Sequence, residues 1–361
     1  MAITAEVING TLKGLADPGT QKDYISKNIQ INDSCVTLDI ELSYPAKSKF
    51  ELIKKAVEEK IQSIPGVSSV TATILTKIAS HVTQGNLQPL KEVKNIIAVA
   101  SGKGGVGKST TAVNLALALA DEGANVGMLD ADIYGPCLPQ MLNLVGRVPE
   151  SKDGGQTILP LESYYGLQVM SIGFMVDTDS PVIWRGPMVT HALEKLLTQT
   201  CWNNLDYLVI DMPPGTGDTQ LTLAQKVPVT GALIVTTPQD IALIDARKGL
   251  KMFEKVHIPI LGVVENMSTY ICSKCGHEER IFGHGGGVKM CKDYNVALLG
   301  SLPLDISIRE FADSGKPTVV GAPDSHQAEI YRAIARRAAI KISESAKNPS
   351  TKFPNIVVQS T

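Results

Sequence analysis

A glycine-rich stretch with two lysines, SGKGGVGKSTT at residues 101–111, constrains this chain more than any other part of its sequence. The residues that satisfy the P-loop pattern G-x-x-x-x-G-K-[ST] are Gly102, Gly107, Lys108 and Ser109. The apolar residues 95–100 before the loop predict a buried strand, and the apolar repeat at residues 113–120 after it predicts a helix. Backbone N–H groups of such a loop and the amino end of such a helix bind polyphosphates. The stretch therefore predicts a site for ATP and Mg²⁺.

The side chains of this loop have distinct expected roles. Lys108 is expected to neutralise the β- and γ-phosphate oxygens, and Ser109 is placed to bind Mg²⁺. Lys103 is an additional lysine that the P-loop pattern does not require, so on its own it is equally well explained as a solvated loop charge. The nucleotide-binding residues predicted in the loop are Gly102, Lys103, Gly104, Gly105, Val106, Gly107, Lys108, Ser109 and Thr110.

Three acidic residues follow predicted buried strands. Strand 125–129 leads into Asp130 and Asp132, and strand 205–210 leads into Asp211. The carboxyl ends of parallel strands border the crevice in which doubly wound sheets bind ligands. We therefore expect Asp130 and Asp211 to support Mg²⁺, and Asp132 to orient the attacking water. The loop after Asp211, rich in proline and glycine, is expected to respond to the γ-phosphate.

The order of predicted elements indicates an α/β fold. Strands alternate with helices after the P-loop, which predicts a doubly wound, mostly parallel sheet. Before it, the alternation at residues 36–42 and the helical spacing at residues 50–64 predict a separate small α/β domain. The expected organisation is a small α/β domain at 1–80, a linker at 81–93, a P-loop ATPase domain at 94–345 and a flexible tail at 346–361.

Composition argues against several classes of partner. The formal net charge of −2 gives no bulk electrostatic reason to expect nucleic acid. No stretch of about eighteen apolar residues occurs, and the N-terminus lacks the pattern of a signal peptide, so we expect a cytoplasmic protein without a membrane partner. Six cysteines in 361 residues do not indicate a disulfide scaffold. Among them, Cys35 and Cys201 are expected to be core thiols.

One pair of cysteines has the spacing of a metal site. Cys272 and Cys275 form C-x-x-C, which presents two thiolates on one side of a turn. Two thiolates are half of a tetrahedral site, and a second copy of the chain would supply the other half. From this pattern alone, iron–sulfur, zinc and thiol redox chemistry all stay open.

Taken together, these motifs resemble the Mrp/ApbC family of iron–sulfur cluster carrier ATPases. The resemblance extends over residues 94–321, and the small domain before it resembles one that often precedes this ATPase and occurs alone in cluster-assembly factors. The segments that carry the resemblance are KGGVGKST, LDADIYGP (129–136), WRGPM (184–188), LDYLVIDMPPGTGD (205–218), TTPQ (236–239), ENMS (265–268), CSKCG, IFGHGG and SLPLD (301–305).

The resemblance implies specific roles. Cys272 and Cys275 would hold a [4Fe–4S] cluster shared within a homodimer, for transfer to apo iron–sulfur proteins, with a cluster-assembly scaffold as a further partner. Lys103 would reach the partner's nucleotide, as in the deviant P-loop of the nitrogenase iron protein and the Min and Par proteins. Asn266 would lie near the adenine. The protein would be a slow ATPase with the catalytic residues Lys103, Lys108, Asp132 and Asp211.

This chain departs from the family pattern at two positions. Cys137 stands where the family usually has serine after DIYGP, and Tyr44 precedes Pro45 where the small domain often has cysteine.

The sequence also leaves two alternative functions open. One is a partition or positioning ATPase of the Min/Par type, which would not require the cysteine pair. The other is an ATPase whose dimer is bridged by zinc, since thiolates alone do not select the metal.

Overall fold

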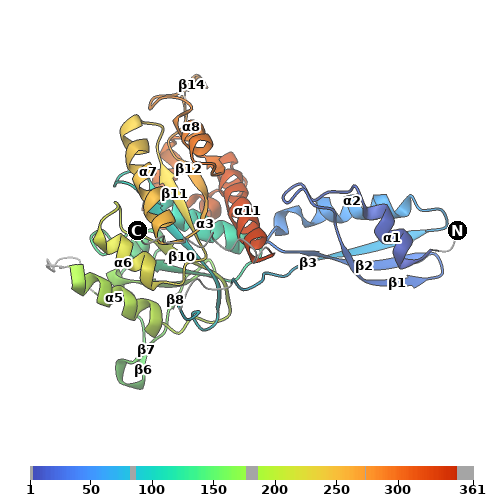
Figure 1. Cartoon of the computed structure of the whole chain (residues 1–361), viewed down its shortest axis with the longest axis horizontal. Coiled ribbons are helices and arrows are strands. Elements are labelled where there is room, and N and C mark those ends of the chain that lie inside the picture. The colour runs from blue at the N-terminus through green and yellow to red at the C-terminus, as the bar shows by residue number, and fades with distance from the viewer. Residues whose placement is uncertain (1–2, 82–86, 176–185, 273, 348–361) are drawn as a thin grey trace, which may run out of the picture.

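The computed structural model describes residues 3–81, 87–175, 186–272 and 274–347. Figure 1 shows two α/β units, a small one that contains the N-terminus and a larger one formed by the rest of the chain. The predicted segments that fall partly outside the described residues are the linker (82–86 of 81–93), the WRGPM segment (184–185 of 184–188), the CSKCG segment (273 of 272–276) and the tail (348–361 of 346–361).

The small unit is a three-stranded sheet with two helices on one face (Figure 1). The strand order is β1-β2-β3, with β1 antiparallel and β3 parallel to the central strand. Alternate side chains of the central strand are buried, from Val36 to Leu42, because only one face of the sheet is covered. The elements are α1 (Ala5–Leu12), β1 (Ser26–Asn32), β2 (Cys35–Leu42), η1 (Lys47–Lys49), α2 (Phe50–Gln62) and β3 (Ser69–Thr76).

The expectation that Cys35 and Cys201 are core thiols is wrong. Both are exposed. Cys35 begins β2, where side chains alternate between the two faces, so Val36 takes the core position and Cys35 the open side. Cys201 lies between the last turn of a helix and the next strand, and its neighbour Trp202 is buried there instead.

The larger unit is organised around an eight-stranded sheet of order β15-β12-β11-β4-β10-β5-β9-β8. All neighbouring strands are parallel except the edge pair β8 and β9. The predicted doubly wound, mostly parallel sheet is confirmed. The strands are β4 (Val93–Ser101), β5 (Val126–Asp130), β8 (Leu161–Glu162), β9 (Gln168–Ser171), β10 (Leu205–Asp211), β11 (Gly231–Thr236), β12 (Ile260–Glu265) and β15 (Leu298–Ser301).

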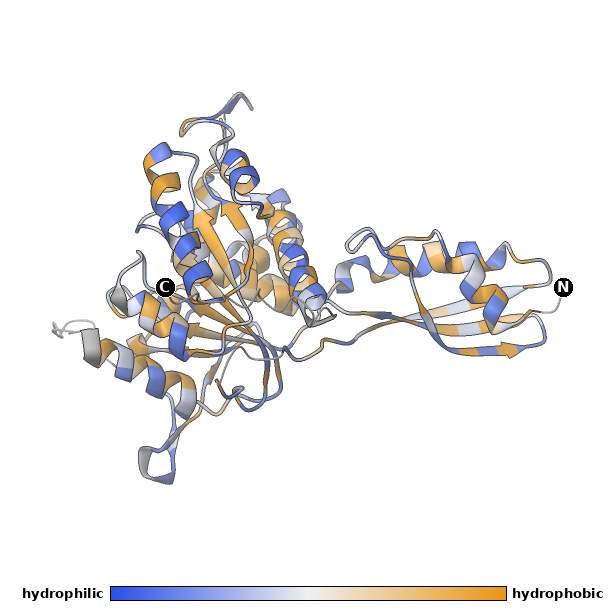
Figure 2. Ribbon diagram, in the orientation of Figure 1, coloured by the Kyte–Doolittle hydropathy of each residue, from blue (hydrophilic) through white to orange (hydrophobic). Residues whose placement is uncertain are grey.

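Helices cover both faces of this sheet. Figure 2 shows apolar strands between helices whose outer sides are polar, and every residue of β10 is buried. Helices α3 and α11 contact each other on one face, while α5, α6 and α7 line the other. Among the described residues, no helix is both long and apolar enough to cross a bilayer. The helices are α3 (Lys108–Asp121), α4 (Leu138–Met141), α5 (Gly186–Gln199), α6 (Asp218–Lys226), α7 (Asp240–Lys255), α8 (Gly286–Asp293), α9 (Ile306–Asp313), α10 (Thr318–Gly321) and α11 (His326–Lys347).

Short elements complete the larger unit. Two small hairpins project from it, one before the edge strands of the sheet and one before α8 (Figure 1). These elements are β6 (Ser151–Lys152), η2 (Asp153–Gly155), β7 (Thr157–Ile158), η3 (Ile172–Phe174), β13 (Tyr270–Ile271) and β14 (Glu278–Glu279).

The two units contact each other at the carboxyl end of the P-loop helix. Glu122, the residue after α3, is fully buried. Its carboxylate accepts hydrogen bonds from the Ser48 N–H at 2.9 Å and the Ser48 Oγ at 2.7 Å, and it forms an ion pair with Arg336 of α11. Beside it, Lys49 pairs with Glu329 at 3.2 Å. A buried carboxylate therefore joins the small unit, the P-loop helix and α11.

We predict that Glu122→Ala lowers the free energy of unfolding by about 3 kcal/mol, because it removes the acceptor of both Ser48 donors and leaves the guanidinium of Arg336 paired only with the more exposed Glu329. Glu329→Ala, which removes a more exposed carboxylate from the same junction, should cost about 1 kcal/mol or less. Urea denaturation followed by circular dichroism measures both. Equal unfolding midpoints for the two variants would contradict the importance given to Glu122.

Candidate nucleotide and metal sites

The glycine-rich loop joins the carboxyl end of β4 to the amino end of α3. Gly107 is the residue before the helix and has a φ of 81°, in the left-handed region that favours glycine. A Cβ at Gly107 would also lie 2.1 Å from Asn266 Nδ2, so a larger residue would displace the Asn266 amide. Around Gly104 and Gly105 there is open space instead. The loop is thus held at one end and open in its middle, where the pattern places phosphate.

The P-loop lysine lies between two carboxylates that come from separate strands. Lys108 is buried, and its Nζ lies 2.5 Å from Asp211 Oδ1 and 3.7 Å from Asp132 Oδ2. The Ser109 hydroxyl lies 3.1 Å from the same Nζ. The structure therefore brings together four side chains to which the sequence assigned catalytic or Mg²⁺-binding roles. Lys103 is half-exposed, and its carbonyl accepts a hydrogen bond from Ser101 Oγ at 2.9 Å.

The second oxygen of Asp211 is suited to bind a cation. Asp211 is fully buried, and within the described part of the chain its Oδ2 has no hydrogen-bond partner. Burial raises the pKa of Asp211, while the charge of Lys108 opposes that shift. A buried carboxylate oxygen without a donor, next to the Ser109 hydroxyl, fits the hard oxygen ligands that Mg²⁺ prefers.

Asp130 is committed to hydrogen bonds with the protein. It is fully buried and accepts the N–H groups of Asp132 and Leu138, both at 3.2 Å, and the Ser171 hydroxyl at 3.0 Å. Burial, followed by the charge of Asp211, raises the pKa of Asp130 to about 7. These three donors join Asp130 to the loop that carries Asp132 and to the end of β9. The expected role of Asp130 toward Mg²⁺ stays a prediction.

Cys137 lies in the same loop, at the start of α4. Its thiol is half-buried. Burial and the nearby charge of Asp130 raise the pKa of Cys137 to about 12. The thiol therefore stays protonated at neutral pH and acts as a neutral neighbour of the P-loop.

Asn266 connects the P-loop to the end of β12. Its Nδ2 donates to the Val106 carbonyl at 2.9 Å, and its own N–H donates to the Thr236 carbonyl at 2.7 Å. Asn266 is buried, and its Oδ1 accepts the N–H of Met267 at 2.9 Å. The residue expected near the adenine thus holds the loop that precedes Lys108.

Cys272 and Cys275 lie in the turn of the β13–β14 hairpin. The Cys272 N–H donates to the His277 carbonyl at 2.9 Å, and the Gly276 N–H donates to the Cys272 carbonyl at 2.8 Å. The backbone N–H groups of Lys274 and Cys275, followed by the Cys275 thiol, lower the pKa of Cys272 by hydrogen-bonding its sulfur. Cys275 is exposed. The turn therefore favours a thiolate at Cys272 beside a second accessible sulfur, which is what a metal or an iron–sulfur cluster requires.

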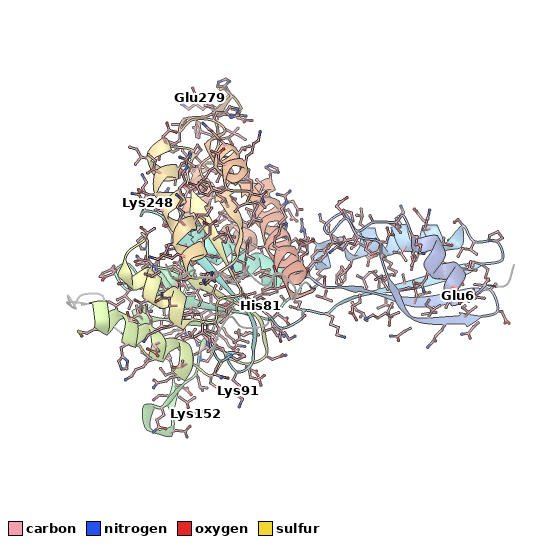
Figure 3. The ribbon with its side chains drawn as sticks, viewed as in Figure 1. Glu6, His81, Lys91, Lys152, Lys248 and Glu279 are labelled. Carbon is pink, nitrogen blue, oxygen red and sulfur yellow. The ribbon has the colours of Figure 1, made fainter. Side chains whose placement is uncertain are left out.

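The hairpin lies at the outer end of the larger unit, beside α8 (Figure 1), where Figure 3 labels Glu279. Within the residues that the structure describes, no group of three or more His, Cys, Asp or Glu side chains is arranged to hold a metal ion. The apolar side chains of Ile271 and Ile281, on either side of the cysteine turn, are 54% and 53% exposed. The cysteine pair is therefore surrounded by surface that a second protein chain could cover.

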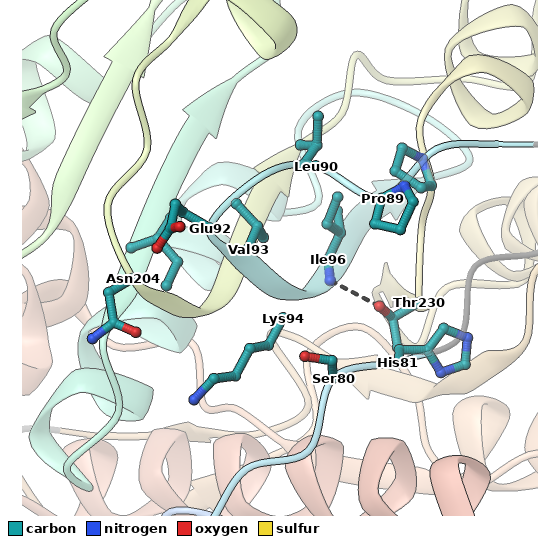
Figure 4. A pocket seen from close by; sticks show the side chains of 12 residues that line it. Ser80, His81, Pro89, Leu90, Glu92, Val93, Lys94, Ile96, Asn204 and Thr230 are labelled. Atoms are coloured by element: carbon teal, nitrogen blue, oxygen red, sulfur yellow. Dashed lines mark hydrogen bonds between the residues drawn. The ribbon is translucent and has the colours of Figure 1, made fainter.

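A cavity of about 380 Å³ lies at the amino ends of the strands, opposite the P-loop (Figure 4). It is lined at the amino ends of β4, β10 and β11, where Thr230 Oγ1 accepts the Ile96 N–H at 2.9 Å. Burial lowers the pKa of His81 on its wall. None of the predicted site residues lines it, so it lies apart from the nucleotide and cysteine sites.

Comparisons with known proteins match both units. A family model described as "NUBPL iron-transfer P-loop NTPase" matches residues 92–339, and one described as "Iron-sulfur cluster assembly protein" matches residues 5–74. The chain is 59% identical over 276 residues to the iron-sulfur cluster carrier protein of Pseudomonas fragi, covering 76% of this chain and 96% of that protein. It is 54% identical over 308 residues to the protein of that name in Escherichia coli K12, covering 85% and 83%. It is 52% identical over 260 residues to the mouse iron-sulfur cluster transfer protein NUBPL, covering 72% and 81%.

Solved structures support the same fold. A nucleotide-binding protein from Archaeoglobus fulgidus in complex with ADP aligns with a TM-score of 0.58 at 34% identity, covering 66% of this chain and 92% of that one. The cell division ATPase MinD from Pyrococcus furiosus aligns with a TM-score of 0.52 at 25% identity, covering 67% and 97%.

We predict that Lys108→Ala weakens ATP binding by about a hundredfold, because it removes the charged donor for the phosphates from a buried site. Titration calorimetry with ATP and Mg²⁺ measures the change, with circular dichroism to establish that the variant is folded. Lys152→Ala, which removes a surface lysine from the β6 hairpin (Figure 3), serves as the matched control and should bind as wild type does. Unchanged affinity in Lys108→Ala would remove Lys108 from the nucleotide site.

Proposed function

Because the chain belongs to the family of NUBPL iron-transfer P-loop NTPases, we propose that it carries a [4Fe–4S] cluster between two copies of itself and transfers it to apo iron–sulfur proteins. The resemblance to iron–sulfur carrier ATPases is confirmed, and the relatives named as carriers favour this function over the Min/Par alternative. The observation that carries the proposal is the β13–β14 turn, in which backbone N–H groups stabilise the Cys272 thiolate beside Cys275. A P-loop NTPase hydrolyses nucleotide, and we propose that slow ATP hydrolysis is coupled to cluster loading or release.

The cluster is the cargo in this proposal, and the chain provides half of its ligands. Cys272 and Cys275 would supply two sulfurs, and the same pair in a second copy would supply the other two. Transfer then exchanges four iron–thiolate bonds for bonds to the cysteines of the recipient, which needs no catalytic acid or base.

The nucleotide site would act through Lys108, Ser109 and Asp211. Lys108 pairs with Asp211 and Asp132, and a bound polyphosphate would offer it a further anion. The Ser109 hydroxyl and the Asp211 Oδ2 are the groups that would hold Mg²⁺, which would neutralise phosphate charge when bound. Asp132 would orient the attacking water.

A dimer is part of the same proposal. Lys103 would complete the nucleotide site of the partner subunit, and the cysteine turns of the two copies would meet. We also propose a cytoplasmic location, with a cluster-assembly scaffold as the source of the cargo. The zinc-bridged dimer is the alternative that uses the same two cysteines.

We predict that anaerobic reconstitution with iron and sulfide loads about four iron and four sulfide per dimer, with a visible absorption band. Cys272→Ala/Cys275→Ala should lose this cluster, whereas Lys108→Ala should keep it, because the P-loop lysine lies outside the cysteine turn. Iron, sulfide and zinc analysis beside the spectrum measures the outcome. Zinc without sulfide would favour the zinc-bridged ATPase, and a stable cluster in the double variant would refute the ligand assignment.

We predict that Lys103→Ala and Lys108→Ala are each inactive as ATPases but regain part of the wild-type rate when mixed. In a mixed dimer, the Lys103→Ala chain keeps Lys108 for its own nucleotide, and its partner supplies the missing Lys103. Phosphate release after mixing, beside each variant alone, is the measurement. If Lys103 acts within its own chain, every site of the mixed dimer lacks one lysine and the mixture stays inactive.

A further inference from the structure

The cysteine turn belongs to an excursion of the chain away from the large sheet. This cysteine excursion, residues 266–286, leaves at the end of β12 and returns at the start of α8. Glu265, the last residue of β12, closes its base: the buried Glu265 Oε1 accepts the N–H of Gly287 at 2.8 Å. Its carbonyl accepts the N–H of Leu302 at 2.9 Å, which holds Glu265 itself in the sheet region. The Glu265 side chain therefore joins the two ends of the excursion by a hydrogen bond.

The local sequence is adapted to this contact. The residue before α8 is Gly285, which offers no side chain to cap the first turn of the helix. Glu265 provides a carboxylate there from a distant part of the chain, where the unpaired N–H groups of the helix favour negative charge. A Cβ at Gly287 would lie 2.6 Å from Glu265 Oε1. A larger residue at this position would therefore displace the Glu265 carboxylate.

The first limb of the excursion has its own anchors. Ser268 donates its N–H to the Leu302 carbonyl at 2.9 Å and its hydroxyl to the same carbonyl at 3.0 Å. The Leu304 N–H donates to the Thr269 carbonyl at 2.7 Å. These bonds hold only the outgoing limb. The returning limb is held by the Glu265–Gly287 hydrogen bond and by the packing of α8, through the buried Met290 and Cys291, against β12 and α7.

The same strand end contacts the nucleotide loop. Asn266, the next residue, donates to the Val106 carbonyl of the P-loop and lies against Gly107. Two consecutive residues thus reach in opposite directions, one to the phosphate loop and one to the base of the cysteine excursion. A small displacement of the P-loop would move Asn266, and through the end of β12 it would also move Glu265.

We propose that Glu265 is a positioning residue for cluster transfer, which makes the position of Cys272 and Cys275 depend on nucleotide occupancy. This inference rests on the proposed function, because it assigns the cysteines their cargo. Glu265 itself contacts neither nucleotide nor cluster. It acts by coupling the returning limb of the excursion to the strand end that holds the P-loop.

The first test compares full-length wild type with Glu265→Ala and Glu265→Gln after reconstitution. The rate at which the iron chelator bathophenanthroline removes iron is measured with and without ATP and Mg²⁺. We expect nucleotide to change this rate in wild type, the effect to be lost in Glu265→Ala, and the effect to be retained in Glu265→Gln, whose amide oxygen can still accept the Gly287 N–H. Cluster content and ATP affinity should stay as in wild type. Glu278→Ala, which removes an exposed carboxylate of the same excursion, is the matched control.

A second test does not depend on the cluster. Amide hydrogen exchange of peptides covering residues 274–286 is measured in cluster-free protein, with and without ATP and Mg²⁺. Nucleotide should change exchange there in wild type and Glu265→Gln, and should not in Glu265→Ala. Gly287→Ala, which crowds the same bond, should also lose the nucleotide effect on exchange and serves as the test if Glu265→Ala does not fold.

A wild type that binds no cluster but shows this exchange pattern would overturn the proposed function and support the coupling. A nucleotide effect in both tests that survives Glu265→Ala would overturn the coupling.

Discussion

The ion pairs of Lys108 with Asp211 and Asp132 are the interaction on which the nucleotide site depends. A buried ammonium needs paired charge, and the two carboxylates come from the ends of β10 and β5. Only a parallel sheet brings the carboxyl ends of β4, β10 and β5 to one edge. The helices on both faces then exclude water from the strands, so the charges meet in a dry environment. The parallel sheet and its covering helices therefore hold Lys108 beside two carboxylates.

Much of this arrangement could be predicted from the sequence because the signals are local. The P-loop fixes a strand, a loop and a helix in succession, and an acidic residue after a buried strand marks the same edge of the sheet. The cysteine turn is also local, since Cys272 is stabilised by N–H groups two and three residues ahead. Where contacts within a few residues determine a site, residue type and spacing are sufficient to predict it.

The remaining features depend on contacts between distant parts of the chain. Glu265 and Gly287 meet across an excursion, and Glu122 meets Ser48 and Arg336 from two other elements. No periodicity predicts either contact. The expectation for Cys35 failed for a different reason: the strand was predicted, but a shift of one residue decides which face a side chain takes. Two of the donors to Asp130 likewise could not be predicted from the sequence, because Leu138 reaches it only through the folded loop and Ser171 only through the pairing of β5 with β9.

The proposed sharing of a cluster between two cysteine turns has a consequence for the amount of cargo that a cell's pool of this protein would hold. Two sulfurs per chain, with no third ligand nearby among the described residues, make a shared cluster a bimolecular product. Mass action then couples loading to the amount of free chain, so dilution releases cargo even when nothing else changes. A dilute carrier would retain fewer clusters per chain than a concentrated one. Expression level would thus set the fraction of chains that are loaded as well as the number of carriers.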